Sequence, residues 1–493
     1  MVSLWGAFDR SHSSGSCFRE ADRRSQQCML HSPILVAGIS RGVGRWVANR
    51  IGRCAMVSFQ GRYTISGATS REKRAEENGV PLDFLLPTLG SAGDVIPVVC
   101  LGRGLVQRGH SATVVANEEF EERVQAAGLG FVPMGTRDEA QKLFADPRLW
   151  DANKGFACIA ELVIGPNVRR LYEVIAARRS ENTVVAASPV CFGARIAQDK
   201  LCVAVATVHV QPSLLRSLVD SGRLGRMPMG PEVPRFLKAG LMALLDKYVI
   251  DKKLGPPVNL LRGELGLAPV AGLFRSYLHS QQLVLGLFPE WFAAPQPDWP
   301  PNVYLTGFVM DESQSAPLTP EVDEFLASGP VVLFTAGSEA KLDAFFRESV
   351  KVARLAGVKA LFVAKHRTPV FDQLPAHVRH AAWVPFPAVF PRCAAVVHHG
   401  GIGTLAHALK AGIPQFVVPH AHDQPDHALR VERLGLGRSL YPEKYRAAPA
   451  ATILKELMES TAIRQRCREY GAQIDGSAAL EKACSLLESL GRA

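Results

Sequence analysis

The chain has 493 residues, of which 47% are hydrophobic and 21% charged, and its formal net charge is +10. This composition is typical of a globular protein, and the length predicts at least two large domains because single cores rarely exceed about 300 residues. Residues 1–80 hold twelve Lys and Arg against six Asp and Glu, so only +4 remains for the rest. The main body has no basic helix or basic aromatic motif, so nucleic acid is not an expected partner.

The cysteines and the distribution of apolar residues indicate the cellular compartment in which the protein is expected. The ten cysteines form no CxxC pair and show no metal-ligand spacing, and several lie in apolar runs, as Cys100, Cys191 and Cys393 do. This pattern is typical of buried, reduced thiols. No apolar run reaches the roughly 18 residues of a membrane-spanning helix, and the N-terminus is not expected to be a secretory signal. We therefore expect a cytoplasmic protein without a bound metal.

Residues 1–80 are predicted to form a poorly ordered extension. Serine and arginine clusters surround one apolar island, 33–51, in which the segment GISRGVG (38–44) imitates the glycine turn of short-chain dehydrogenases. A single strand and helix cannot bury their apolar faces, and no dehydrogenase body follows, so a tail is the favoured interpretation. A start of translation further along, for example at Met56, stays open.

An alternation of strands and helices begins at Leu82. An apolar strand at 84–86 precedes a glycine-rich turn, 90–94, and a helix over 95–108, and further strands are expected at 112–116, 130–133, 183–187 and 203–207. This pattern predicts a Rossmann-like domain over residues 81–310. Residues 211–276 read as helical. Their apolar segments are expected to pack in the core or, as a minor alternative, to line an apolar acceptor site or rest on a membrane.

A polar, proline-containing linker is predicted at 311–330, and a second domain at 331–493. A strand at 331–334 runs into a small-residue turn with Gly337 and Ser338, and short strands are expected at 360–364 and 382–384. Residues 394–424 then read as strand, glycine turn, helix and strand. The fold class predicted for the whole chain is α/β, with two Rossmann-like domains facing a central cleft.

The segment AAVVHHGGIGTLAHALKAGIPQFVVPHAHDQ (394–424) has the features of a phosphate and sugar site. Glycines let the backbone approach a ligand closely, and free N–H groups at a helix start face an anion. Asp423 and Gln424 offer an acceptor and a mixed donor and acceptor to sugar hydroxyls. The candidate donor-binding residues in this segment are His398, Gly400, Gly401, Gly403, Thr404, Asp423 and Gln424.

The HHGG-x-GT run followed by DQ resembles the nucleotide-sugar signature of the family 1 glycosyltransferases. The resemblance implies the GT-B fold and inverting transfer without a metal or other cofactor. It also implies that Gly337 and Ser338 touch the diphosphate and that Trp383 and Val384, in a tryptophan-x-proline motif, bind the nucleotide base. Plant members carry a glutamine where Phe386 stands and a ribose-binding glutamate near Ala406, so uridine and thymidine both stay open.

The turn GSAGD (90–94) places Asp94 at a helix start after the first strand. Position alone allows a helix cap or a general base. The GS-x-GD pattern resembles bacterial family members, in which this aspartate is the proposed base, so Asp94 is our candidate catalytic residue. Ser91, Gly93 and His209 are the acceptor-side candidates, and a packed structural histidine is the alternative for His209.

Three further stretches, 146–151, 278–280 and 289–300, resemble the rhamnosyltransferases of rhamnolipid biosynthesis. This implies transfer of L-rhamnose from dTDP-rhamnose to a hydroxyalkanoyloxy-alkanoate. The alternatives are a UDP-glucose-dependent glucosyltransferase of a sterol, lipid or secondary metabolite, a nucleotide-sugar 2-epimerase, and a partner subunit that binds nucleotide without turnover. The expected partners are a nucleotide-sugar, a lipid-like hydroxyl acceptor and, peripherally, the inner face of a membrane.

Overall fold

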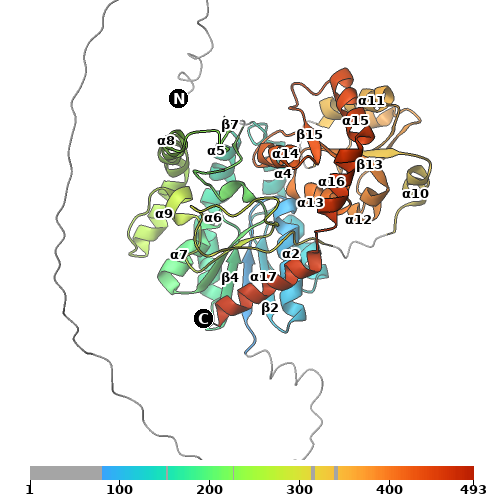
Figure 1. Ribbon diagram of the computed structural model, residues 1–493. Coiled ribbons are helices and arrows are strands. Elements are labelled where there is room, and N and C mark those ends of the chain that lie inside the picture. Colours follow the sequence, from blue (N-terminus) through green and yellow to red (C-terminus); the bar gives the residue numbers. More distant parts are fainter. Residues whose placement is uncertain (1–79, 152–153, 226, 312–316, 338–341, 493) are drawn as a thin grey trace, which may run out of the picture. The chain divides into compact units, whose positions relative to one another are not determined.

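The computed structural model describes residues 80–492 except 152–153, 226, 312–316 and 338–341 (Figure 1). Every described residue belongs to one compact unit, which begins at Ala68. The predicted N-terminal extension with its 38–44 segment, part of the predicted linker, and Ser338 lie outside the described residues.

The first domain is built on a seven-stranded sheet in which every pairing is parallel. The strand order is β3-β2-β1-β4-β5-β8-β9, so the order reverses beside β1, where such sheets bind ligands. The strands are β1 (Asp83–Pro87), β2 (Ser111–Ala116), β3 (Gly130–Pro133), β4 (Thr183–Ala187), β5 (Ala204–His209), β8 (Leu283–Gly286) and β9 (Val303–Leu305).

Helices cover this sheet, and a small antiparallel hairpin stands beside it (Figure 1). The helices are α2 (Ala92–Gln107), α3 (Glu121–Ala126), α4 (Arg137–Ala145), α5 (Gly155–Ile159), α6 (Gly165–Arg178), α7 (Phe192–Leu201), α8 (Arg235–Leu245) and α9 (Asp251–Glu264). A π-helical turn, η4 (Asp246–Ile250), joins α8 to α9, and the hairpin consists of β6 (Arg223–Leu224) and β7 (Met227–Pro228).

The second domain contains a six-stranded parallel sheet of order β12-β11-β10-β13-β14-β15. Its strands are β10 (Val331–Thr335), β11 (Lys359–Val363), β12 (Val378–Ala381), β13 (Cys393–His398), β14 (Gln415–Val417) and β15 (Gly437–Ser439). Its helices are α10 (Pro320–Ala327), α11 (Leu342–Ala356), α12 (Phe386–Val389), α13 (Ile402–Lys410), α14 (Gln424–Arg433), α15 (Ala447–Glu459) and α16 (Thr461–Gly471).

Burial on both faces explains why these strands read as apolar runs. Every residue of β4 and of β10 is buried, as expected for a parallel sheet with helices on each side. The predicted fold class, α/β with two Rossmann-like domains, is confirmed. The strand predicted at 382–384 is wrong, since β12 spans Val378–Ala381. This edge strand has the sequence VRHA, in which only Val378 is buried, so no apolar run marks it.

The last helix, α17 (Gly476–Gly491), departs from the predicted division at residue 331. Its buried residues Ala479, Ala483 and Leu487 belong to the core that includes Phe84 of β1. In Figure 1 this red helix runs along the blue and green elements of the first domain. The end of the chain therefore packs with the first domain. None of the helices in the described part combines the length and apolar character needed to cross a bilayer.

A charged cluster fixes α17 to the end of α2. Glu488 accepts two hydrogen bonds from Arg108, at 2.7 and 2.9 Å, and one from Nε2 of His110 at 2.9 Å. The other ring nitrogen of His110 accepts the N–H of Leu82 at 3.2 Å. The hydrogen bond from Arg108 is the main cause that lowers the pKa of Glu488 below its usual value.

We expect Glu488→Gln to lower the free energy of unfolding at pH 7 by roughly 1–3 kcal/mol, because Arg108 loses a partly buried charged partner. A carboxyl whose pKa is lowered by folding stabilises the native state above its unfolded pKa of about 4.5, and this contribution disappears as the pH falls through the folded pKa. The difference between parent and variant, measured by urea unfolding, should therefore shrink below pH 4. Glu481→Gln is the matched control: Glu481 also contacts Arg108 but is 73% exposed, so its effect should stay below about 1 kcal/mol.

Candidate active site

Two helices begin at the carboxyl ends of central strands, one in each sheet, and their first turns lie next to each other. Helix α2 follows β1, and α13 follows β13. A Cβ atom added to Gly93 in α2 would stand 3.7 Å from Cγ2 of Ile402, the first residue of α13. Ligands of open α/β sheets bind at such strand ends, and helix N-termini favour anions. The glycine-rich turns of the two domains thus meet at one place.

Asp94 is the third residue of α2, and its carboxylate folds back over the helix start. Its Oδ2 accepts the N–H of Ser91 at 2.9 Å and the Ser91 hydroxyl at 3.4 Å. Gly90 makes this placement possible, since a Cβ there would stand 2.2 Å from Oδ2 of Asp94. The N-cap of α2 is Ser91, and Asp94 completes a capping box with it, so the capping role considered from sequence is shared between the two residues. The residue before Asp94, Gly93, is the one that approaches α13 of the second domain.

The electrostatic setting of Asp94 suits proton transfer. Burial is the main cause that raises the pKa of Asp94 to about 7, and the carboxylate of Asp423 is the second. Hydrogen bonds from Ser91 act in the opposite direction. Asp423 precedes α14 in the second domain, so acidic groups from both sheets influence each other here. A carboxyl with a pKa near neutrality is well matched to accept a proton at physiological pH.

Gly90→Ala should displace the Asp94 carboxylate and reduce catalysis at least tenfold, because the new methyl group and Oδ2 cannot share this space. The backbone of Gly90, with φ of +152°, should add roughly 1–3 kcal/mol of strain. Gly109→Ala is the control: Gly109 also has a positive φ, +96°, but an added Cβ meets nothing within 4 Å. Thermal unfolding should show a stability loss in both variants and transfer assays a loss only in Gly90→Ala. Equal activity losses would contradict the prediction.

The two adjacent histidines of the glycine loop have different roles. His398, the last residue of β13, is fully buried. Its Nδ1 accepts the N–H of Gly400 at 3.1 Å, and its Nε2 donates to Oε1 of Gln415 at 3.0 Å. Burial lowers the pKa of His398 to about 4, so it is neutral. With both nitrogens engaged inside the domain, His398 shapes the loop and has no N–H left for a ligand, unlike the diphosphate contact expected from sequence.

His399 was not among the predicted site residues, and it occupies the centre of this loop. A Cβ on Gly337 would stand 2.6 Å from Cε1 of His399, and a Cβ on Gly401 would stand 2.4 Å from its Nε2. The glycines therefore leave room for the imidazole. Burial lowers the pKa of His399 to about 3, and a hydrogen bond with the backbone of Thr335 acts in the opposite direction. Within the described residues its buried Nδ1 has no hydrogen-bond partner. Its place directly after the buried strand-end histidine was the signal available in the sequence.

The first turn of α13 contains the other predicted phosphate ligands. Gly401 precedes the helix as its cap, and Gly403 and Thr404 follow within the first turn. An added Cβ on Gly403 would meet no atom within 4 Å, so the space over this turn is open. Gly400, with φ of +95°, turns the chain between strand and helix. The backbone N–H groups at this helix start are available in the way an anion site requires.

Asp423 and Gln424 stand at the start of α14. Oε1 of Gln424 accepts the N–H groups of His420 and Ala421, at 2.8 and 3.2 Å, so this oxygen serves its own loop. The Asp423 carboxylate lies 3.7 Å from Nδ1 of His427, which also donates to the carbonyl of Gly400 at 2.7 Å. His427 thus joins the start of α14 to the glycine loop. Sequence reasoning missed it, although its spacing of four from Asp423 on a helix was a usable signal.

The hairpin of the first domain contacts α14. The N–H of Arg223 donates to Oδ1 of Asp426 at 3.0 Å, and Arg430 donates to Oδ2 of the same aspartate at 2.7 Å. Arg433 contacts Asp220 at 3.0 Å. The helix that begins with Asp423 and Gln424 is therefore positioned partly by residues of the first domain.

The two residues predicted to bind the nucleotide base differ in exposure. Trp383 is 53% exposed just after β12, whereas Val384 is buried. An exposed indole near the carboxyl end of a strand is available for stacking.

His209, at the end of β5, is only 1% exposed, and its ring centroid lies 5.1 Å from that of His279. Burial lowers its pKa well below the usual value, so His209 is a neutral, enclosed side chain.

Two family models match this chain, one in each domain. Residues 84–218 match the glycosyltransferase family 28 N-terminal domain, and residues 351–477 match the C-terminal domain of the erythromycin biosynthesis protein CIII-like family. The chain is a glycosyltransferase. This enzyme depends on a nucleotide-sugar, and the epimerase considered from the sequence is set aside.

Relatives of the glycosyltransferase span most of its length. O-mycaminosyltylonolide 6-deoxyallosyltransferase of Streptomyces fradiae is 28% identical over 421 residues, covering 82% of this chain and 96% of the relative. Sterol 3-beta-glucosyltransferase of Komagataella phaffii is 24% identical over 504 residues, covering 97% of this chain, which spans only 40% of that protein.

Solved structures show the same fold. The glycotransferase of kitacinnamycin superposes with a TM-score of 0.64 at 20% identity, covering 84% of this chain and 100% of that one. VinC, a glycosyltransferase in complex with dTDP, superposes with a TM-score of 0.58 at 19% identity, covering 84% and 100%. The GT-B architecture expected from the glycine-rich signature is therefore confirmed.

Proposed function

We propose that this glycosyltransferase moves a hexosyl group onto the hydroxyl of a lipid-like acceptor with inversion at the anomeric carbon. L-rhamnose from dTDP-rhamnose is the first candidate donor sugar, and a hydroxyalkanoyloxy-alkanoate is the first candidate acceptor. The observation that carries the proposal is that Asp94, with its pKa raised to about 7, follows Gly93, whose added Cβ would stand 3.7 Å from Ile402 in the first turn of α13. Asp94 accepts a proton, and the first turn of α13 stabilises a departing anion.

The chemical step uses this arrangement directly. The acceptor hydroxyl gives its proton to the Asp94 carboxylate as its oxygen forms a bond to the anomeric carbon. The bond between that carbon and the diphosphate oxygen breaks, and its electron pair leaves with the nucleoside diphosphate. The N–H groups of Gly403 and Thr404 at the start of α13 stabilise the negative charge that develops.

His399 completes the diphosphate site in this proposal. The imidazole is neutral, it stands between Gly337 and Gly401, and its Nδ1 lacks a partner among the described residues. In this proposal a phosphate oxygen replaces the backbone of Thr335 as the partner of the single N–H that a neutral imidazole has. Ser338 remains a proposed diphosphate contact, and Trp383 with Val384 a proposed base-binding pair.

Asp423 and Gln424 are proposed to bind the sugar. The Asp423 carboxylate accepts hydrogen bonds from hydroxyls, and the amide nitrogen of Gln424 donates, since its oxygen already serves the backbone of its own loop. Because the charge of Asp423 also raises the pKa of Asp94, the sugar-binding residue tunes the proposed base.

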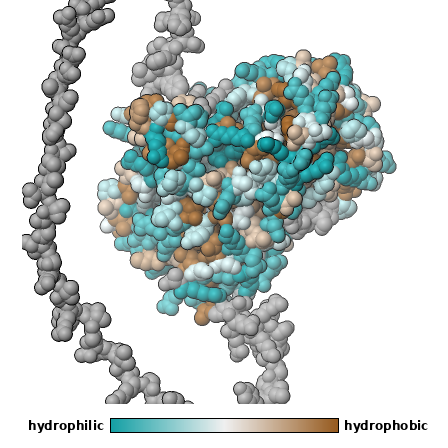
Figure 2. All heavy atoms as spheres, viewed as in Figure 1, coloured by the Kyte–Doolittle hydropathy of each residue, from teal (hydrophilic) through white to brown (hydrophobic). Residues whose placement is uncertain are grey.

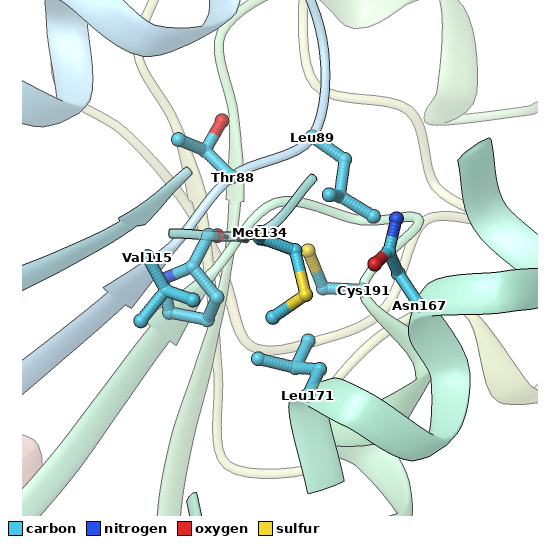
Figure 3. A pocket seen from close by; sticks show the side chains of 8 residues that line it. Thr88, Leu89, Val115, Met134, Asn167, Leu171 and Cys191 are labelled. Carbon is cyan, nitrogen blue, oxygen red and sulfur yellow. Dashed lines mark hydrogen bonds between the residues drawn. The ribbon is translucent and has the colours of Figure 1, made fainter. Parts of the chain in front are cut away.

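Mostly apolar side chains gather on the acceptor side, at the carboxyl ends of β1 and β2 (Figure 3). They pack so closely that no free volume for a water-sized molecule is left between them, and Leu89 in this group precedes the Asp94 turn. Ligand pockets for drug-sized molecules usually occupy about 300–1,000 Å³, so these side chains supply apolar surface near the Asp94 turn and not a pocket for an acceptor. The residues of this group are Pro87, Thr88, Leu89, Val115, Met134, Asn167, Leu171 and Cys191.

The sterol 3-beta-glucosyltransferase match favours a second candidate, a UDP-glucose-dependent glucosyltransferase of a sterol, because that alignment extends over 97% of this chain. The Streptomyces relative is named for a macrolide substrate, which is also bulky and largely apolar. Both relatives therefore agree with an apolar acceptor, and they differ in the sugar.

A donor screen tests the proposal. The protein is incubated with dTDP-rhamnose, UDP-rhamnose, dTDP-glucose or UDP-glucose, with and without a detergent-dispersed hydroxyalkanoyloxy-alkanoate or a sterol, and released nucleoside diphosphate is measured. We expect release that depends on the acceptor and is fastest with dTDP-rhamnose. Fastest release with UDP-glucose and sterol would establish the second candidate, and nucleotide binding without product would contradict both.

A further inference from the structure

The outer face of α8 is apolar, and its inner face holds a lysine. Of the residues in this helix only Lys238 and Met242 are buried. Phe236 is 74% exposed, Leu237 53% and Leu244 57%. Helices of water-soluble domains normally turn their apolar side chains to the core. The reversed pattern leaves a group of apolar side chains on the surface of the described part of the chain.

Lys238 fixes the helix in this orientation. Its ammonium group donates to the carbonyl of Gly230 at 2.9 Å and to that of Met229 at 3.3 Å, and it also contacts the carbonyl of Val219. A rotation of α8 that buried Phe236 and Leu244 would pull this charge out of its ring of carbonyl oxygens. The exposure of the apolar side chains is therefore a property of the folded domain.

Positive charge borders the apolar side chains. Positions 236, 240 and 244 recur at helical spacing and share one face, which continues to Tyr248 on η4, 42% exposed. Four cations on or next to this face are exposed: Arg235, Lys247, Lys252 and Lys253. Within the described part of the chain none of the four forms an ion pair, and Nζ of Lys247 stands 5.2 Å from the ring centroid of Tyr248.

We propose that this surface, the α8 face, binds an anionic lipid bilayer. It consists of Phe236, Leu237, Leu244 and Tyr248 with Arg235, Lys247, Lys252 and Lys253. Aromatic and leucine side chains enter the boundary between headgroups and acyl chains, and lysine and arginine attract anionic headgroups. In Figure 2 hydrophobic residues gather at the upper left of the folded part, where Figure 1 places α8.

The charge pattern favours a lipid surface over a second copy of the chain. Two α8 faces packed against each other would bring four exposed cations of each copy together, and the one exposed acid between residues 231 and 253, Glu232, does not balance them, which opposes association. A bilayer with anionic headgroups supplies both the apolar layer and the opposite charge. The proposal goes beyond the chemistry of transfer, since it depends on neither the sugar nor the acceptor.

Vesicle binding of the full chain tests the α8 face. We expect co-sedimentation with phosphatidylcholine vesicles that contain phosphatidylglycerol, and little with phosphatidylcholine alone. The double variant Phe236→Ser/Leu244→Ser should bind anionic vesicles about tenfold more weakly, and Lys247→Glu/Lys252→Glu should do the same at low salt only. Leu355→Ser on α11 is the matched control, because Leu355 is a 45% exposed leucine away from this face, and it should bind like the parent.

The measured quantity is the vesicle affinity of each variant relative to the parent. Residues 1–80 carry a net charge of +6 and attract anionic vesicles equally in every variant, so their contribution cancels in this ratio. The substituted side chains are exposed, so thermal unfolding of all variants should match the parent. Unchanged vesicle affinity in both double variants would overturn the proposal. So would a parent dimer, seen by sedimentation velocity, that Phe236→Ser/Leu244→Ser dissociates. Because donor and acceptor are absent, failure here is distinct from failure of the proposed transfer reaction.

Discussion

Asp94→Asn is expected to reduce transfer by about 10²–10⁴-fold, the usual contribution of a positioned general base. The substitution keeps the shape of the side chain, and the asparagine oxygen can still accept the N–H of Ser91, so α2 should keep its cap. Donor binding should change little because the proposed diphosphate site is on α13. Turnover with acceptor, and nucleoside diphosphate affinity by calorimetry, separate the two effects. Unchanged turnover would remove Asp94 from the role of base.

The pH dependence gives Asp94 a second signature. Its pKa is raised to about 7, and only the ionised carboxylate accepts a proton. The rate of transfer at low substrate should therefore fall about tenfold per pH unit below pH 7 and level off above it. In Asp94→Asn this fall in rate below pH 7 should disappear. In Asp423→Asn the rate should begin to fall at a lower pH, since the substitution removes a charge that raises the pKa of Asp94.

Sequence patterns determined the two sheets well because their strands are buried on both faces. The apolar runs of β4 and β10 are direct consequences of that burial. The return of α17 to the first domain was not predictable, because Ala483 and Leu487 read only as one face of an amphipathic helix. Which core receives such a face depends on tertiary contacts, here including those between Glu488 and Arg108.

At the candidate site, motif spacing predicted which segments meet but not what each side chain does. The HHGG run contains two histidines of the same chemistry, and only the structure separates them: His398 is enclosed by Gly400 and Gln415, whereas His399 occupies the space left by two glycines. The double role of Asp94 has the same origin. An aspartate at a helix start can be a capping residue or a base, and the sequence pattern is the same for both. The pKa that suits Asp94 to the role of base depends partly on Asp423, which is more than 300 residues away in the sequence.

One set of contacts connects the α8 face with the donor side. Lys238 holds the carbonyls of Val219 and Gly230, at the two ends of the hairpin segment. Within that segment the N–H of Arg223 donates to Asp426 on α14, the helix that begins with the proposed sugar ligands. The surface proposed to meet lipid and the helix proposed to hold the sugar are therefore attached to the same hairpin.

His399→Ala is expected to weaken nucleoside diphosphate binding by about ten- to hundredfold, the range for a lost hydrogen bond to a charged group. Because the pKa of His399 is lowered to about 3, the imidazole is neutral, and this loss should be the same from pH 6 to pH 9. Gly401→Ala should have a similar effect, since its Cβ would stand 2.4 Å from Nε2 of His399. His399→Gln should restore part of the affinity through its amide N–H.

His398→Ala is the comparison that separates ligand contact from loop structure. It leaves the N–H of Gly400 and the side chain of Gln415 without their buried partner, so its main effect should be a lower unfolding temperature. Calorimetry with nucleoside diphosphate and thermal unfolding of both variants should therefore give opposite patterns. If His399→Ala left the affinity unchanged while His398→Ala abolished it without loss of stability, the diphosphate would lie against His398, and the assignment built on the two glycines would be wrong.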